Sequence, residues 1–229
     1  MLSYIKSDKG LRSNNEDFAL DAQVGKYKIF AVADGMGGEN NGEVASSVAC
    51  NTVITNLVSY FEANDNPSEN DIKDVLNNVF QDANKEILKT CADAGLRDSD
   101  MGTTLTVAVI RERKAIIAHI GDTRAYLKHG SSLTRLTSDH VSNTDSNQLV
   151  KFLGVNCFIN PDIYSYNIMY GDLFVLCTDG VYKNLSDATI VECLKIHNDL
   201  EGSADKLFTA AMEAGSSDNL TVLLANIRP

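Results

Sequence analysis

Two stretches of the chain place apolar residues at helical spacing. Over residues 42–61, and again over residues 70–92, apolar side chains recur every three or four positions, so they would fall on one face of a helix. Ser68, with Asp71 three residues later, resembles a capping box at the start of the second stretch, and Gly95 is suited to end it. The pattern predicts two long amphipathic helices, one directly after the other.

Most other apolar residues stand in short runs rich in β-branched and aromatic side chains, as is typical of strands. These runs cover residues 27–33, 104–110, 115–120, 124–128, 173–177 and 220–225. Polar turns of hairpin length at 111–114 and 129–132 favour antiparallel pairing. Two shorter helices are expected near residues 187–196 and 204–214. This order of elements predicts a sheet-on-sheet core covered by helical layers.

Length and charge narrow the class of protein. The chain has 229 residues, of which 44% are apolar and 22% charged, and it contains no linker-like segment, so one globular domain spanning 1–229 is expected. A domain of this size can bury a full core without a structural metal, and any metal should therefore serve chemistry. The formal net charge of −11 would repel phosphate backbones and anionic lipids, which argues against a nucleic-acid partner.

The N-terminal residues and the cysteines predict a cytoplasmic protein. The first residues lack the apolar core and cleavage site of a signal peptide, and no window approaches 18 consecutive apolar residues, so no membrane segment is expected. The five cysteines are widely spaced and form no Cys-x-x-Cys pair. This usage is typical of buried thiols in a reducing compartment.

Four aspartates stand beside the ends of predicted strands. Asp34, Asp122 and Asp179 follow apolar runs, and Asp218 precedes the last one. Neighbouring antiparallel strands start and end at the same edge, so these carboxylates could meet there, where oxygen ligands suit Mg²⁺ or Mn²⁺. The glycines after Asp34 and Asp179 fit tight turns close to an ion. Each Asp-Gly pair alone could be ordinary turn chemistry, but four such carboxylates together favour a metal site.

Seven segments carry a family resemblance. They are RSNNEDFAL at 12–20, FAVADGMGG at 30–38, MGTTLTVAVI at 101–110, HIGDTRAYL at 119–127, LTSDH at 136–140, GDLFVLCTDGVY at 171–182 and SSDNLTVLLANI at 216–227. In this order they resemble the PPM-type metal-dependent serine/threonine protein phosphatases, the protein phosphatase 2C group, and the ADGMGG form resembles the bacterial branch. The resemblance implies an α+β fold, a four-layer αββα sandwich of two antiparallel sheets flanked by antiparallel helix pairs.

The resemblance also implies a set of metal ligands. Asp34 would bridge two Mg²⁺ or Mn²⁺ ions, the Gly35 carbonyl would contact one of them, and Asp179 and Asp218 would complete the protein ligands of the first ion. Asp122, with Asp179, would hold a third, weaker ion.

Three further residues receive roles around those ions. Glu16 would reach the second ion through water, Asp17 would support that shell, and Arg12 would bind the substrate phosphate, as planar guanidinium groups do. The implied reaction is hydrolysis of phosphoserine and phosphothreonine in proteins by in-line attack of a metal-bridging hydroxide. A monomeric signalling enzyme that opposes a bacterial Ser/Thr kinase is expected.

The chain departs from the family pattern at two places. Met36 stands where eukaryotic members have a histidine proposed as general acid, so the leaving oxygen would take its proton from metal-bound water. Only the 12 residues 141–152 separate the LTSDH motif from Leu153, where bacterial relatives have a longer segment with a mobile flap. The chain is therefore expected to lack the flap, to have a more open site, and to select substrates through other surface loops.

Competing interpretations rest on weaker signals. Cys91 and Arg97 have the Cys-x5-Arg spacing of cysteine-dependent tyrosine phosphatases, but Cys91 lies near a helix end rather than on a phosphate-binding loop. His119 is expected to be structural, and His140 to steady nearby loops. No Gly-x-Ser-x-Gly motif supports a serine hydrolase. Two alternatives of the same fold stay open: an inactive phosphoprotein-binding scaffold, and a phosphatase dedicated to one regulatory phosphoprotein.

Overall fold

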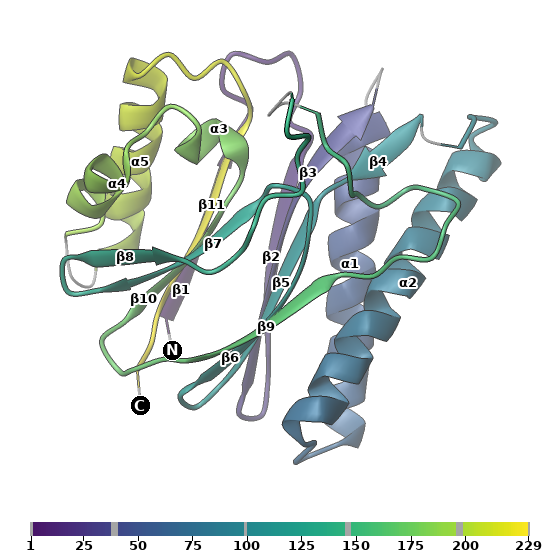
Figure 1. Ribbon diagram of the computed structural model, residues 1–229, viewed down its shortest axis with the longest axis horizontal. Coiled ribbons are helices and arrows are strands. Elements are labelled where there is room, and N and C mark those ends of the chain that lie inside the picture. The colour runs from purple at the N-terminus through teal and green to yellow at the C-terminus, as the bar shows by residue number, and fades with distance from the viewer. Residues whose placement is uncertain (1, 38–40, 99, 145–147, 196–198, 229) are drawn as a thin grey trace.

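The computed structural model describes residues 2–37, 41–98, 100–144, 148–195 and 199–228. Gly38 of the ADGMGG motif, the expected helix end at residue 196, and His197 lie outside these ranges. Within them, two antiparallel sheets face each other at the centre of the molecule, and helices cover both outer faces (Figure 1).

One sheet has the strand order β1-β11-β10-β7-β8. Its strands are β1 (Leu2–Asp8), β11 (Leu220–Asn226), β10 (Leu173–Cys177), β7 (Arg124–His129) and β8 (Ser132–Arg135). The other sheet has the order β2-β3-β5-β6-β9, with β4 (Met101–Thr103) paired to the end of β3. Its strands are β2 (Asp17–Val24), β3 (Tyr27–Gly37), β5 (Leu105–Arg111), β6 (Lys114–Ile120) and β9 (Asp162–Asn167). Every pairing is antiparallel, as the hairpin spacing predicts.

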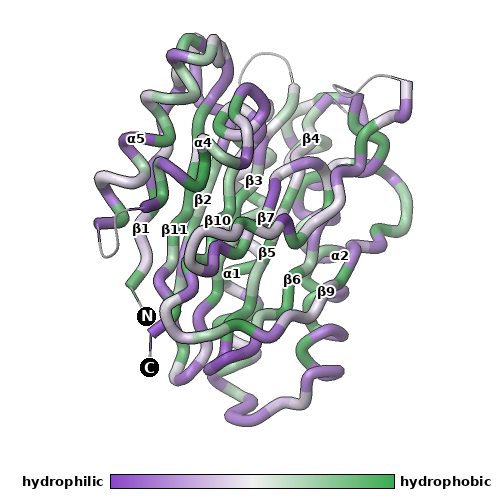
Figure 2. Tube along the Cα trace, turned by 60° about the vertical axis from the view of Figure 1, so that its left-hand side comes forward, coloured by the Kyte–Doolittle hydropathy of each residue, from purple (hydrophilic) through white to green (hydrophobic). Residues whose placement is uncertain are grey.

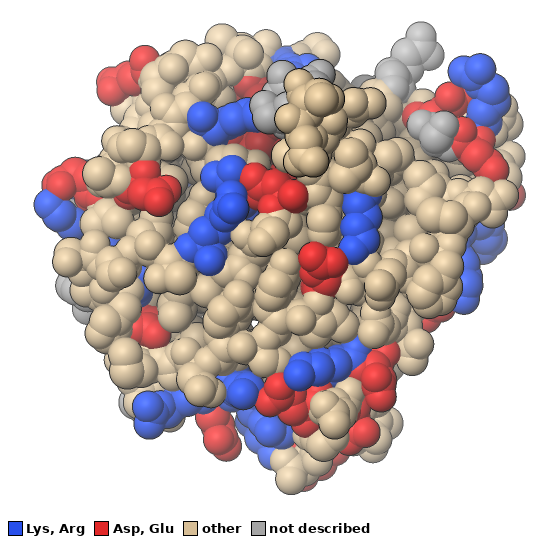
Figure 3. Space-filling view, viewed as in Figure 1, with Lys and Arg blue, Asp and Glu red and all other residues tan. Residues whose placement is uncertain are grey.

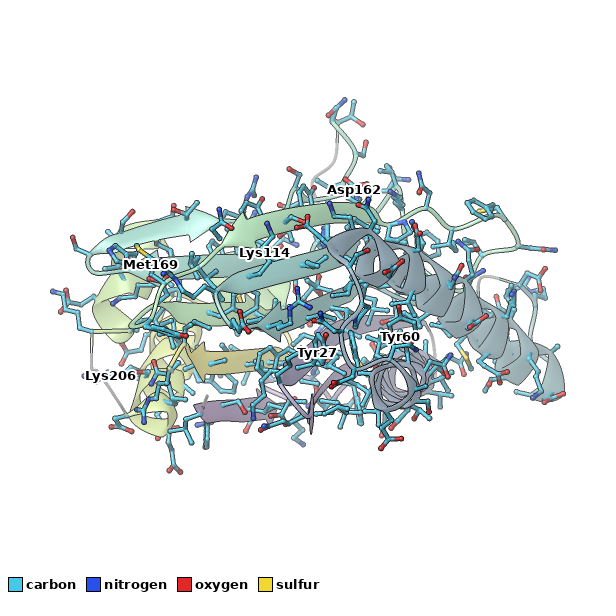
Figure 4. The ribbon with its side chains drawn as sticks, turned by 90° about the horizontal axis from the view of Figure 1, so that it is seen from below. Tyr27, Tyr60, Lys114, Asp162, Met169 and Lys206 are labelled. Carbon is cyan, nitrogen blue, oxygen red and sulfur yellow. The ribbon has the colours of Figure 1, made fainter. Side chains whose placement is uncertain are left out.

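Two helix pairs form the outer layers. The long helices α1 (Asn41–Ala63) and α2 (Glu69–Asp93) cover the sheet that contains β3. On the other sheet lie α4 (Asp187–Cys193) and α5 (Leu200–Glu213), and the four-residue helix α3 (Asp179–Tyr182) follows β10. The predicted αββα sandwich is confirmed, and the view from below shows its layers edge-on (Figure 4).

The core consists of three apolar clusters, one between the sheets and one under each helix pair. On β3, Ile29 and Ala31 face the helices, whereas Phe30 and Val32 face the opposite sheet, where Phe30 stacks on Phe174 at 6.4 Å between ring centroids. Because both faces are buried, the central strands are continuous apolar runs, visible as green segments in Figure 2.

The helix start and stop signals are confirmed. The Ser68 side chain accepts from the Asp71 N–H, and the Asp71 carboxylate accepts from the Ser68 N–H, which completes the capping box of α2. Gly95 follows with φ +72°, in the left-handed region that favours glycine after a helix. The two shorter predicted helices also form, as α4 and α5, although α5 begins at Leu200 rather than at the expected residue 204.

The strands that the pattern did not predict are chiefly the edge strands β1, β2, β8 and β9. Their side chains are mostly half-buried or exposed, and their sequences are accordingly polar, as solvated sheet edges favour. The short strand β4, which continues the sheet beyond Asp34, was also not predicted.

Four cysteines are buried as expected, but Cys157 is exposed, which corrects the prediction for that residue.

By length and composition α1 could cross a membrane. In this fold α1 packs on β2, β3 and α2. The Tyr27 ring of β3 stacks on Phe61 of α1, and Figure 4 labels Tyr27 and the neighbouring Tyr60 at this contact between helix and sheet.

Candidate active site

A cleft of about 670 Å³ opens at one end of the sandwich, beside α3 and the end of β3 at the top of Figure 1. Its wall is formed by several separate segments. They are the C-terminal part of β3, the β1–β2 loop, the β6–β7 connection, α3 with the residue after it, the two residues before β11, and residues 148–152. Its charged lining residues are Arg12, Glu16, Asp34, Asp122, Asp179, Lys183 and Asp218. Segments far apart in sequence therefore bring five carboxylates and two basic groups to one place.

Asp34 is fixed by main-chain and threonine contacts. Its N–H donates to Thr104 Oγ1, and its carbonyl accepts from the Thr104 N–H and from Thr103 Oγ1, all at 2.9 Å. Thr104 Oγ1 in turn lies 2.7 Å from Thr123 Oγ1. Asp34 was expected at the end of a strand, but β3 continues to Gly37 and pairs there with β4, so the carboxylate projects from within the sheet.

Asp17 lies directly across the ladder from Asp34 and is buried behind the cleft. Its Oδ2 accepts from Thr178 Oγ1 at 2.7 Å, whereas Oδ1 is buried with no hydrogen-bond partner among the described residues. Burial raises the pKa of Asp17 to about 7 against the lowering by its threonine hydrogen bonds, and the charges of Asp179 and Asp218 add smaller increases. An unpartnered buried carboxylate oxygen indicates that a cation is needed nearby.

Asp179 begins α3, so the glycine after it lies in a helix and not in the expected tight turn. Its Oδ2 lies 2.8 Å from Lys183 Nζ, one helical turn later. The glycine after it is required by packing, since a Cβ on Gly180 would lie 1.9 Å from the Asn219 carbonyl oxygen. Gly35 is similar, because a Cβ there would lie 2.0 Å from the Gly42 carbonyl oxygen. Glycine is required at both positions because two backbone segments approach closely there, and not because of a positive φ.

The β1–β2 loop carries Arg12 and Glu16 and is held by Asn219. The Asn219 side-chain amide donates to the carbonyls of Lys9 and Asn14, each at 2.9 Å, and its Oδ1 accepts from the Glu16 N–H at 2.8 Å. Asn219 is thus the residue that fixes this loop against the start of β11.

The β1–β2 loop brings Arg12 to the cleft. Arg12 Nη2 lies 3.0 Å from Asp218 Oδ2, so the guanidinium stands at the rim beside a carboxylate. Burial raises the pKa of Glu16, although hydrogen bonding to Asn14 and the charge of Arg12 oppose the shift.

Asp122 lies in the connection between β6 and β7 and is 7% exposed. Its main-chain carbonyl accepts from the Tyr182 hydroxyl at 2.8 Å, which ties this connection to α3. Burial, followed by the charge of Asp179, raises the pKa of Asp122 to about 6, and Lys183 opposes the shift. All four predicted strand-end aspartates therefore line one cleft.

The crowding of these carboxylates fits a bound cation. Burial raises the pKa of Asp34 well above its ordinary value, and so do the charges of the surrounding carboxylates, which are Asp17, Asp179, Asp122 and Asp218. Oxygen-only surroundings of this kind suit Mg²⁺ or Mn²⁺. No three acidic, histidine or cysteine side chains of the described residues could enclose an ion by themselves. Water and main-chain carbonyls would complete its shell.

The structure supports the rejection of the cysteine mechanism. Cys91 is buried at the end of α2, its Sγ donates to the Arg97 carbonyl at 3.0 Å, and burial raises the pKa of its thiol, whereas a nucleophile needs a lowered one. Arg97 pairs with Asp100 instead.

The two histidines of the motifs are structural, as expected. His119 is fully buried between Thr106 Oγ1 and the Ser138 carbonyl, and burial lowers its pKa to about 4. His140 stacks on it, accepts from the Gly121 N–H and binds Asp162, so it steadies the neighbouring loops.

The segment over residues 141–152 still reaches the cleft. Residues 145–147 of this segment lie outside the described ranges. Gln148, Leu149 and Phe152 line the wall together with Met36. The short segment thus supplies an apolar side to an otherwise acidic cleft. That substrates are selected through other surface loops stays a prediction.

Several residues in or behind the cleft were not singled out from the sequence. Thr103, Thr104, Thr178, Lys183 and Asn219 hold or neutralise the acidic residues. Four of them stand next to a predicted aspartate or within the MGTT motif, so the motif strings contained the signal. Lys183 lies beyond the end of the GDLFVLCTDGVY string, and only its place one turn after Asp179 could have indicated it.

Comparison with known proteins gives one consistent result. The sequence model of protein phosphatase 2C matches residues 9–225. The serine/threonine phosphatase stp of Listeria innocua is 31% identical over 98% of this chain and 95% of its own. The structure of Stp1 from Staphylococcus aureus has a TM-score of 0.87 at 26% identity, covering 99% of this chain and 95% of that one. The catalytic domain of PstP, in complex with two manganese ions, has a TM-score of 0.81 at 30% identity, covering 100% and 98%.

The alignment with the Listeria protein spans 243 residues, more than the 229 of this chain. The relative therefore has residues without a counterpart in this chain.

Proposed function

Because the chain belongs to the protein phosphatase 2C family, it is a metal-dependent protein serine/threonine phosphatase, and we propose that the acidic cleft is its active site. The observation that carries this assignment is the convergence of five carboxylates from separate segments on one cleft, with the unpartnered Asp17 oxygen behind them. The PstP structure with two manganese ions supports metal dependence for the family.

The ligand set we propose uses residues of the cleft wall. Asp34 would bridge two Mg²⁺ or Mn²⁺ ions, with the Gly35 carbonyl, Asp179 and Asp218 as further ligands, since all four residues line the cleft. Bound divalent ions would neutralise the phosphate and activate the attacking water. Glu16 would contact the second ion through a water molecule.

The chain's own residues bind and orient the substrate. Arg12 stands at the rim beside Asp218, where its guanidinium can donate two parallel hydrogen bonds to phosphate oxygens. Asp17 lends negative charge from behind Asp34 and so strengthens the hold on cations. Met36 has no proton to give, and no histidine is among the described residues that line the cleft. The leaving oxygen would therefore take its proton from water.

The third ion that the resemblance implies, at Asp122 and Asp179, is an expectation that a count of bound ions would test. Both residues line the cleft, but Lys183 lies beside them. The cellular setting is likewise proposed: phosphorylated proteins as substrates, a Ser/Thr kinase as the opposing enzyme, signalling in the cytoplasm, and a monomeric enzyme. On the face shown in Figure 3, acidic and basic side chains are interspersed, in keeping with a protein rather than a nucleic-acid partner.

The decisive test is phosphate release from a phosphothreonine peptide by the purified chain, with Mn²⁺ and then with excess EDTA. We expect activity that requires Mn²⁺ and is lost with EDTA. Activity that survives EDTA would contradict the assignment. Binding of Mn²⁺ without turnover on any peptide or phosphoprotein would indicate the inactive scaffold.

A comparison of phosphopeptides with candidate phosphoproteins tests whether the enzyme is dedicated to one partner. Similar rates on all of them would argue against a dedicated substrate. Activity confined to one regulatory phosphoprotein would support it.

The short segment at residues 141–152 gives a test of substrate choice. Gln148, Leu149 and Phe152 border the cleft where longer relatives are expected to carry a flap. Grafting the longer segment of such a relative should change the order of preference among phosphopeptides. An unchanged order of preference would show that this segment does not select substrates.

A further inference from the structure

Lys183 is built into the acidic side of the cleft by the local fold. It follows α3 directly, its main-chain N–H donates to the Asp179 carbonyl at 2.9 Å, and its Nζ lies 2.8 Å from Asp179 Oδ2. The same helical turn thus joins the two residues twice. The Asp179 side chain is 14% exposed, so its ion pair with Lys183 is largely withdrawn from water.

Asp122 borders the same space as Lys183. Both residues line the main cleft, and both also line an adjoining pocket of about 270 Å³. The Tyr182 hydroxyl of α3 donates to the Asp122 carbonyl at 2.8 Å, and Lys183, the next residue, pairs with Asp179 at the start of the same helix. An ammonium group therefore stands where these two carboxylates face the same space.

We propose that Lys183 supplies the positive charge for Asp122 and Asp179, so that this phosphatase binds two divalent ions and excludes a third. The inference rests on the proposed function, because it assumes that Asp34 and its neighbours hold the first two ions. Lys183 acts through the two aspartates and is therefore a positioning residue.

The charges of the cleft agree with this role. Its lining contains five carboxylates and two basic side chains, a formal charge of −3. Two divalent ions would turn this to +1, which is suited to a phosphate anion. A third ion would have to displace Nζ from Asp179 Oδ2 and would add like charge beside the ammonium. Removal of the ammonium would free both aspartates for that ion.

The experiment counts Mn²⁺ ions per chain by equilibrium dialysis and by native mass spectrometry as the Mn²⁺ concentration is raised. It compares the wild type with Lys183→Met, which keeps the length of the side chain and removes its charge. Lys183→Arg restores the charge. The matched control is Lys73→Met on α2, which breaks another i,i+4 ion pair of 2.8 Å, to Glu69, away from the cleft.

We expect two ions per chain in the wild type, in Lys183→Arg and in Lys73→Met, and three in Lys183→Met. Adding Asp122→Asn to Lys183→Met should return the count to two. The Mn²⁺ dependence of the rate should gain a second, weaker phase only in Lys183→Met.

Each contrary result identifies what has failed. Three ions in the wild type, or two in Lys183→Met, would overturn the role of Lys183 while leaving the two-ion phosphatase intact. Fewer than two ions in the wild type would overturn the proposed metal site itself, and this inference with it.

Discussion

Asp17 provides a direct test of the idea that the metal-free cleft carries uncompensated negative charge. Its pKa is raised from 3.8 to about 7 in the folded chain, chiefly by burial. For an acid whose folded pKa is raised, the unfolded state binds fewer protons between the two values, so stability falls as the pH rises through that range and is constant above it. Asp17→Asn removes this dependence, because the amide does not titrate.

The size of the effect follows from the shift. At pH 8 the raised pKa of Asp17 costs the metal-free fold about 4 kcal/mol, and at pH 5, where the folded chain keeps this carboxyl protonated, it costs about 2 kcal/mol. Relative to wild type, Asp17→Asn should therefore gain about 2 kcal/mol in unfolding free energy on going from pH 5 to pH 8. Any loss from the altered hydrogen bond to Thr178 is the same at both pH values and cancels in this comparison.

The assay is urea unfolding in EDTA at pH 5 and pH 8, followed by circular dichroism. Asp74→Asn, at an exposed position on α2, is the control and should follow the wild type at both pH values. With Mn²⁺ present the sign should reverse, because the Asp17 charge then faces bound cations, and the variant should bind Mn²⁺ more weakly. An equal difference between Asp17→Asn and wild type at both pH values in EDTA would refute the reasoning.

Further predictions concern the residues around the ions. Asp34→Ala should lower kcat by roughly 10³-fold or more while the chain stays folded, as measured by peptide turnover and thermal unfolding; retained turnover with bound metal would contradict its bridging role. Arg12→Ala should raise KM by roughly 10-fold to 100-fold, the effect of a charge-assisted hydrogen bond to phosphate, and an unchanged KM would exclude that contact. Asn219→Ala removes three hydrogen bonds to the β1–β2 loop and should cost about 3 kcal/mol in urea unfolding, together with a fall in kcat/KM. Gly180→Ala should destabilise the fold by about 2 kcal/mol or more, because its Cβ would overlap the Asn219 carbonyl. Wild-type stability of Asn219→Ala would refute the hydrogen-bonding argument, and wild-type stability of Gly180→Ala would refute the packing argument.

Local patterns were enough wherever one physical preference dominates. The two long helices follow from their apolar spacing, and α2 follows also from the capping box of Ser68 and Asp71. Central strands such as β5 and β10 were recognised because burial on both faces makes them continuous apolar runs. The edge strands were not predicted, since a half-solvated strand such as β9 carries a polar sequence that resembles a loop.

The acidic residues of the site were also predicted from the sequence, because each stands beside an apolar run and within a family motif. Their surroundings were not. That β3 continues beyond Asp34 depends on pairing with β4, and that Asp179 opens a helix depends on the packing of Gly180 against Asn219. Contacts between residues so far apart in sequence leave no local pattern.

The sequence by itself determined the class of fold, the family and the identity of the acidic residues, because helical period, apolar runs and motif strings are local properties. Only the tertiary structure decided how the charges are balanced. Asp17 is buried behind Asp34 by the register of two strands, Asn219 holds the loop of Arg12, and Lys183 neutralises Asp179 from the position directly after α3. Electrostatic interactions depend on distance in space and on burial, and both are set only when the sheets, helices and loops pack together.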